Sequence, residues 1–196
     1  PAIFEGDLAN PNVVWEKARK FDVGIDANFF NNKLSLTIDY FHDTRYDQLV
    51  QPGSIPAMLG IKAAPTNIAE TVNRGFDGMV DFQTPIGKDL YFNSSFVFSI
   101  AKNKVVFKDE PSPAYPWLAE TGHPINQPFG YTYVGFYSEA DVARLNDEDP
   151  DNNVPVPVNS TAIQAGDLKY ADLNEDGLID DLDKSAIGMP NLPKVI

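Results

Sequence analysis

The feature that most constrains this chain is a strict two-residue alternation of apolar and polar side chains in four segments. In residues 20–30 the apolar positions are Phe21, Val23, Ile25, Ala27 and Phe29, separated by polar residues or Gly. The same alternation fills residues 34–42, where Phe41 is an exception, and residues 75–84 and 90–101. Because successive side chains of a strand point to opposite faces, the pattern predicts four β-strands.

The connections between these segments alternate in length. Residues 31–33 and 85–89 read as tight turns, whereas residues 43–74 and 102–196 form long connections. Outer-membrane barrels have short periplasmic turns and long extracellular loops. We therefore expect an all-β fold of antiparallel strands, and the connection lengths suit an outer-membrane β-barrel. Residues 1–101 would supply four barrel strands with one long extracellular loop, and residues 102–196 a long acidic extracellular loop region.

Carboxylates recur on the polar side of the predicted strands. They are Asp22, Asp26, Asp39, Asp77 and Asp81. An unpaired charge is costly in a dry interior, so these residues suit the wet lumen of a barrel better than the inside of a sandwich. A half-exposed antiparallel sheet with a solvated polar face gives the same alternation, however. The alternation alone leaves both structures open.

Composition narrows the function. The chain has no Cys and only two His, which excludes disulfides and thiolate metal sites and disfavours zinc or a histidine-based triad. A glycosidase with paired carboxylates is a remote alternative, because no pair has a separation that the sequence defines. We expect no enzyme. No run approaches the roughly 18 apolar residues of a membrane-spanning helix. The chain begins at Pro1 without a signal-like stretch, so we expect a fragment.

Negative charge is concentrated in the last third of the chain. The formal net charge is -13, and residues 139–183 contain 13 Asp and Glu against only Arg144 and Lys169. Such a segment repels nucleic acid and suits cations or a basic partner. It is equally compatible with an ordinary solvated surface loop.

Residues 172–183, DLNEDGLIDDLD, have the spacing of a calcium loop. An EF-hand loop needs oxygen ligands at positions one, three and five, Gly at six, a carbonyl at seven and a carboxylate at twelve. Gly177 falls at position six, and Ile179 is placed to anchor the loop. The predicted Ca²⁺ ligands are Asp172, Asn174, Asp176, the carbonyl of Leu178, Asp180 and Asp183.

Two departures from an EF-hand indicate a structural rather than a sensing site. Asp183 stands where a calcium sensor has a longer, bidentate Glu. Residues 166–171 do not form an amphipathic entering helix, so the loop is expected to be an isolated module. The alternative is an Asp- and Gly-rich turn that holds water.

The remaining features of the last third are local. Ser138 is a candidate N-cap for a short helix through Leu145. Residues 147–157, DEDPDNNVPVP, are expected to be an exposed, flexible excursion. Trp117, Tyr131, Tyr133 and Tyr137 can stack on a ligand such as a sugar ring, although aromatic residues of a long loop more often form its own small core.

Several motifs together resemble the SusC/RagA family of TonB-dependent outer-membrane transporters from Bacteroidetes. They are NPNVVWE at residues 10–16 with the strand pair that follows to residue 50, NRGF at 73–76, PINQPFGY at 124–131, AGDLKYADLNEDGLID at 165–180, and IGMPN at 187–191. Their order and approximate spacing match the family over nearly the whole chain. Asp77-Gly-Met79 and Asn126-Gln-Pro128 depart from its pattern and leave details of specificity open.

The resemblance implies a plugged barrel of about 22 strands in the cell outer membrane. It further implies an importer of glycans or peptides under a SusD-like surface lipoprotein, energised by TonB through an N-terminal part outside this chain. The lipid bilayer would be a partner, and nucleic acid would not. A secreted β-rich binding or adhesion module with a dockerin-like calcium loop is the alternative, and it would fold by itself in water.

Overall fold

The computed structural model describes residues 9–54, 63–146, 154–160 and 162–190 of the chain. They form two compact units. The sheet unit comprises the described residues up to Pro111 together with Glu120–Ile125, and the loop unit comprises Ser112–Ala119 and Asn126–Pro190. None of the described helices is long and apolar enough to cross a bilayer.

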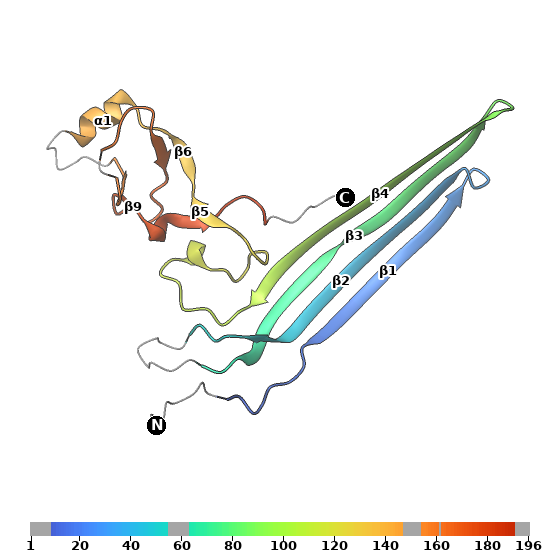
Figure 1. Cartoon of the computed structure of the whole chain (residues 1–196), viewed down its shortest axis with the longest axis horizontal. Coiled ribbons are helices and arrows are strands. Elements are labelled where there is room, and N and C mark those ends of the chain that lie inside the picture. The colour runs from blue at the N-terminus through green and yellow to red at the C-terminus, as the bar shows by residue number, and fades with distance from the viewer. Residues whose placement is uncertain (1–8, 55–62, 147–153, 161, 191–196) are drawn as a thin grey trace, which may run out of the picture. The chain divides into compact units, whose positions relative to one another are not determined.

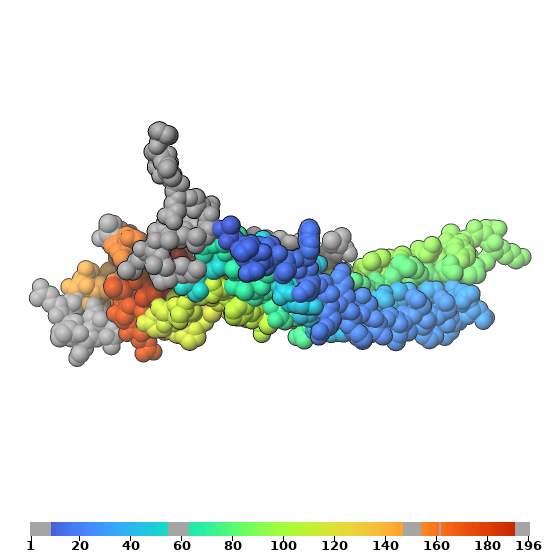
Figure 2. Space-filling view, turned by 90° about the horizontal axis from the view of Figure 1, so that it is seen from below, coloured from blue at the N-terminus to red at the C-terminus, as the bar shows by residue number. Residues whose placement is uncertain are grey.

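The sheet unit is an antiparallel meander of four long strands (Figure 1). The strands are β1 Lys17–Phe29, β2 Leu34–Val50, β3 Thr66–Ile86 and β4 Leu90–Phe107, in the order β1-β2-β3-β4. This confirms the all-β prediction and the four predicted strands. Two tight turns join β1 to β2 and β3 to β4, and the β3–β4 tip extends beyond the β1–β2 tip (Figure 2). In the first turn Phe30, Asn31 and Asn32 have φ values of 55°, 57° and 63°.

Strands β2 and β3 are longer than the sequence pattern predicts. The connection expected over residues 43–74 shrinks to residues 51–65, because Thr44 pairs with Val72 and Leu49 with Asn67. The register shifts between Arg45 and Gln48, where Asp47 has a φ of 58°. Backbone pairing thus continues past the point where the apolar alternation ends, and side-chain periodicity alone cannot detect it.

Cross-strand register gives the sheet two distinct faces. On the apolar face, Phe21, Val23 and Ile25 of β1 pair with His42, Tyr40 and Ile38 of β2. These three residues of β2 pair in turn with Arg74, Phe76 and Gly78 of β3. The polar face carries Asp22, Asp26, Asp39, Asp77 and Asp81. A slip of one residue would exchange the two faces, so the hydrophobic pattern fixes the register.

The loop unit is built from short elements around a small core. Its strands are β5 Phe129–Tyr131, β6 Tyr133–Phe136, β7 Val156–Pro157, β8 Leu168–Tyr170, β9 Leu178–Ile179 and β10 Lys184–Ala186, and its helices are η2 Pro116–Leu118, α1 Glu139–Leu145 and η3 Asp181–Asp183. Strand β10 pairs with β5, β6 with β8, and β7 with β9 in parallel. Tyr137, Val154, Ile179 and Asp183 are buried.

The prediction of an exposed, flexible segment over residues 147–157 is wrong for residues 154–157, the part that the structure describes. Val154 is 6% exposed, and Val156 and Pro157 pair with Leu178 and Ile179. The Pro-rich composition suggested a loop, but an extended Val-Pro segment also suits an edge strand. Residues 147–153 lie outside the described residues. The predicted helix is confirmed, with Ser138 as its N-cap.

Candidate functional site

The apolar face of the sheet unit is exposed along its whole length. Ile25 is 67% exposed, Phe96 61% and Phe76 50%. Hydrophobic burial contributes about 25 cal/mol per Å² of apolar surface removed from water, so a face of this extent requires an apolar environment. On β4 the apolar positions run from Leu90 to Ile100, and a membrane-crossing strand needs about 9–11 residues.

The opposite face is polar, and its carboxylates bond to neighbouring hydroxyl groups. Thr37 Oγ1 donates to Asp26 Oδ1 at 2.7 Å, and Ser99 Oγ donates to Asp77 Oδ1 at 2.5 Å. Asp39 pairs directly with Asp77, and the other residues of this row, Gly24 and Ser99, carry no positive charge. These short local bonds and unneutralised charges are compatible with a hydrated face.

Phe41 is an aromatic side chain on the polar face of β2, and its partner Gly75 leaves room for its ring. Gly75 is the register partner of both Phe41 and Ala101. A Cβ at position 75 would lie 2.7 Å from Phe41 Cζ. The ring of Phe41 therefore lies over the backbone of a residue that has no side chain, and the Asn73-Arg-Gly-Phe76 motif has a packing role.

The four candidate stacking aromatics have different environments. Tyr137 is 2% exposed and its hydroxyl donates to the carbonyl of Pro155 at 2.6 Å, so its predicted role in ligand stacking is wrong. Trp117 is half-buried, stacks on Tyr115 at 4.6 Å between ring centroids, and donates to the carbonyl of Leu182 at 2.8 Å. Tyr131 packs against Tyr170. All three serve the packing of the loop unit.

Tyr133 is the candidate aromatic that stays accessible in the loop unit. It is 51% exposed, and its ring lies 5.6 Å from that of Phe136, which is 60% exposed. Phe136 was not singled out from the sequence as a stacking candidate. Tyr133 and Phe136 stand three residues apart in the sequence with Gly135 between them, and this was the available signal. In the structure Gly135 has a φ of 147°.

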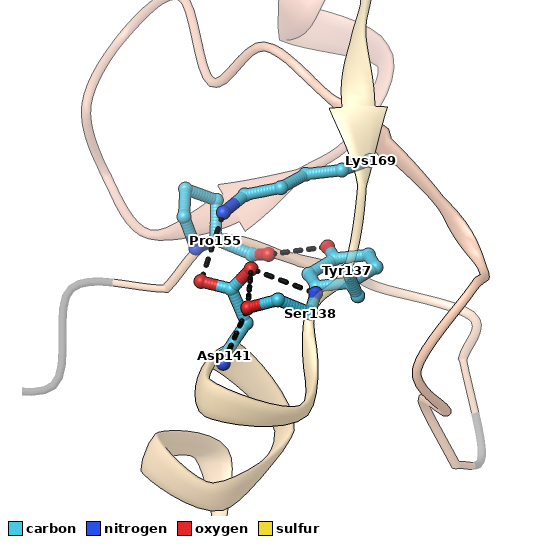
Figure 3. A network of polar contacts seen from close by, with 5 residues as sticks. All are labelled: Tyr137, Ser138, Asp141, Pro155 and Lys169. Carbon is cyan, nitrogen blue, oxygen red and sulfur yellow. Dashed lines mark hydrogen bonds and ion pairs between the residues drawn. The ribbon is translucent and has the colours of Figure 1, made fainter.

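A polar network ties helix α1 to the rest of the loop unit (Figure 3). Asp141 accepts from the backbone N–H and the hydroxyl of Ser138, both at 3.0 Å, and from Lys169 Nζ at 3.2 Å. The backbone bond from Ser138, then its hydroxyl and then Lys169, lower the pKa of Asp141 to about 2. Desolvation raises the pKa of Tyr137, with Asp141 and Asp167 adding to the effect.

The depressed pKa of Asp141 predicts that acid weakens this network. An unfolded Asp has a pKa of about 3.9, so the stabilisation is complete above that pH and is lost as the pH falls towards 2. We expect hydrogen-exchange protection of the α1 amides, corrected for intrinsic rates, to fall across this window in the full-length protein. Asp141→Asn should have low protection at pH 7 and little pH dependence. Glu139→Gln, an exposed carboxylate in the same helical turn, is the control, and equal pH profiles for both variants would contradict the assignment.

The backbone of residues 172–183 has the glycine turn and the buried anchor residue that the calcium motif predicts. Gly177 has a φ of 85°, and Ile179 at position eight is 4% exposed and anchors the loop. Asp172 Oδ2 accepts from the N–H of Gly177 at 2.8 Å, and Asp176 Oδ1 accepts from that of Leu178 at 2.8 Å. Strand β8 precedes the loop, which confirms that no entering helix is present.

Asp183 and Asp172 are the unusual carboxylates of this loop. Asp183 is 0% exposed, and its two oxygens accept from the N–H groups of Leu173 at 2.8 Å and Asp180 at 2.9 Å. Asp172 Oδ1 is buried without a hydrogen-bond partner, as a metal-directed oxygen would be. In the described part of the chain no group of three or more His, Asp or Glu side chains is positioned to hold a metal. The calcium ligands stay a prediction.

Comparison with known proteins gives the family. The profile of the family described as TonB dependent receptor-like, beta-barrel, matches residues 1–182. TonB-dependent receptor P3 of Formosa agariphila is 29% identical over 202 residues, covering 94% of this chain and 18% of that receptor. TonB-dependent receptor P26 of the same organism is 24% identical, covering 97% and 19%. The chain thus spans about a fifth of the length of these relatives.

Solved structures show the same fold. The RagAB peptide importer in its closed-closed state matches with a TM-score of 0.63 and 20% identity over 97% of this chain and 20% of that one. The open-open state of the same importer matches with a TM-score of 0.66 and 18% identity, over 96% of this chain and 19% of that one. These likenesses agree with the two-faced sheet, and the family match places the chain in an outer-membrane barrel. The chain belongs to the TonB dependent receptor-like β-barrel family.

Proposed function

We propose that the protein containing this chain is a TonB-dependent outer-membrane importer of the SusC/RagA type, which takes up glycans or peptides with a SusD-like lipoprotein. The observation that carries the proposal is the family match over residues 1–182, together with a sheet that has one exposed apolar face and one polar face. The exposed apolar face also disfavours a secreted module that folds alone in water.

The connections suggest an orientation for the strands. The tight turns between β1 and β2 and between β3 and β4 would lie at the periplasmic side, and residues 51–65 and the loop unit at the extracellular side. The polar face would then line the lumen and face the plug of the complete barrel. No catalytic role is proposed for the carboxylates of either unit.

The loop unit offers a surface for cargo or for the lipoprotein. The neighbouring RagAB structures are of a peptide importer, which supports peptides as one cargo class. The exposed pair Tyr133 and Phe136 would supply aromatic contact area at low cost in conformational entropy. Calcium, held by the acidic loop of residues 172–183, would stabilise the neighbouring strands rather than act as a sensor.

Transport assays test this proposal. In cells that lack the gene, the full-length protein should restore uptake of labelled oligopeptides or oligosaccharides, and uptake should vanish in a strain without TonB. Replacing Tyr133 and Phe136 by Ala should weaken cargo or lipoprotein binding about tenfold, because two stacking contacts are lost. Tyr91→Leu, an exposed aromatic near the β3–β4 tip, is the control. Uptake that persists without TonB would contradict the proposal.

A further inference from the structure

Cationic side chains form a belt on the apolar face, directly beyond the end of its apolar band. Strand register places His42, Arg74 and Lys102 in one row across β2, β3 and β4. The next row contains Arg19 of β1 and Lys104 of β4, with Thr44 and Val72 between them. We call Arg19, Arg74, Lys102 and Lys104 the cationic belt. No carboxylate lies in either row.

Three residues of the belt, Arg74, Lys102 and Lys104, have no charge partner among the described residues. Arg74 and Lys102 are direct register partners, and like charges in opposite positions destabilise a sheet. The side chains of Arg74, Lys102 and Lys104 are exposed, and no hydrogen bond or ion pair from the described residues reaches them. On the polar face, by contrast, Arg45 pairs with Asp43 at 3.2 Å. Arg74, Lys102 and Lys104 therefore lack the compensation that an anion would provide, whereas Arg19 lines a pocket with the carboxylates Asp47 and Glu70.

The position of the belt relative to the apolar band identifies the anion. On β4 the band ends at Ile100, and Lys102 and Lys104 are the next two residues on the same face. The last apolar row holds Tyr40 and Phe76, whose ring centroids are 5.1 Å apart, and aromatic residues mark the membrane–water boundary of barrels. Since rows are about 7 Å apart, the belt begins at the depth of the lipid headgroups.

We propose that the cationic belt binds the phosphate groups of outer-leaflet lipids. Arg binds phosphate through two parallel N–H bonds, and Lys does so as a point charge, so Arg74 flanked by Lys102 and Lys104 suits a headgroup with more than one phosphate. The assignment to the outer leaflet rests on the proposed orientation, in which the long connections are extracellular. At the other edge of the band the two tight turns carry only Lys33 and Lys88 as cations.

Lipid binding by the full-length protein tests the proposal. Purified in a neutral detergent, the protein would be titrated with diphosphoryl lipid A, with phosphatidylcholine and with inorganic phosphate, and bound lipid counted by native mass spectrometry. We expect preference for diphosphoryl lipid A, weakened about tenfold in Arg74→Gln/Lys102→Gln. The control Lys20→Gln/Arg45→Gln removes the same charge from the polar face and should bind as the unchanged protein does.

Two outcomes of this titration would overturn the inference. Equal binding by both double variants would place the lipid elsewhere. Saturation by inorganic phosphate at the same concentrations would indicate a site for the free anion instead of a lipid contact. The folded fraction is checked by heat-modifiable gel mobility, so a misfolded variant is recognised. Uptake is measured on the same proteins, and lipid selectivity without TonB-dependent uptake would reject the proposed function while leaving the belt assignment intact.

Discussion

Replacing Gly75 by Ala in the full-length protein is expected to prevent most of the chain from assembling into a folded barrel. A Cβ at position 75 would lie 2.1 Å from the carbonyl oxygen of Ile100 and 2.9 Å from the Cα of Ala101, both backbone atoms of β4. Neither can move without breaking the ladder that pairs β3 with β4. Overpacking of side chains costs about 1–3 kcal/mol, and a clash with the paired backbone of β4 is expected to cost more than that range.

A second glycine on the same strand provides the matched control. A Cβ at Gly78 would meet Phe98 Cζ, the far end of a side chain, at 2.4 Å, and the backbone carbonyl oxygen of Thr37 at 3.0 Å, which a shift of a few tenths of an ångström relieves. Gly78→Ala should therefore assemble nearly normally. Heat-modifiable gel mobility of outer-membrane fractions measures the folded share. Since the backbone clash dominates, Phe41→Ala should not rescue Gly75→Ala, and assembly of Gly75→Ala at the level of Gly78→Ala would refute this explanation.

Alternation in the sequence was sufficient to predict the four strands where each crosses an apolar environment. Phe21 to Phe29 and Leu90 to Ile100 carry that signal, because every second side chain must be apolar there. Past His42 the side chains become polar while backbone pairing continues to Val50, so β2 was predicted too short. The belt was also hidden, since Arg74 and Lys102 meet only through a register that pairs distant segments.

In the loop unit, local signals were predictable and burial was not. Ser138 with Asp141 three residues later gives a helix start that depends on neighbouring residues alone. The burial of Tyr137 depends on Pro155 and Lys169, which are remote in sequence. The fully buried Asp183 is similar: its spacing from Asp172 was visible, but its bonds to the N–H groups of Leu173 and Asp180 were not.

Calcium is expected to slow hydrogen exchange strongly in residues 172–183 of the full-length protein. The loop carries Asp172, Asp176 and Asp183, which the structure does not bring together into a metal-binding group, and one oxygen of Asp172 is buried and unpartnered. A bound divalent cation would neutralise this charge and satisfy that oxygen, and it would favour the closed loop over the open one. Calcium at 100 times its Kd stabilises the form that binds it by about 2.7 kcal/mol, which corresponds to roughly 100-fold greater protection.

Two variants with equal loss of charge make this measurement specific. Asp172→Asn keeps an acceptor for the N–H of Gly177 but lacks the second carboxylate oxygen, so the calcium response should disappear while the loop still closes. Asp181→Asn should respond as the unchanged protein does, because the Asp181 side chain is 86% exposed and pairs at 2.7 Å with Lys184, which follows the loop. Protection of the Leu173, Gly177 and Leu178 amides, with calcium and with a chelator, reports the effect directly. If those amides exchange at the same rate in both conditions, the loop is a closed turn whose carboxylates are satisfied by backbone N–H groups and water alone.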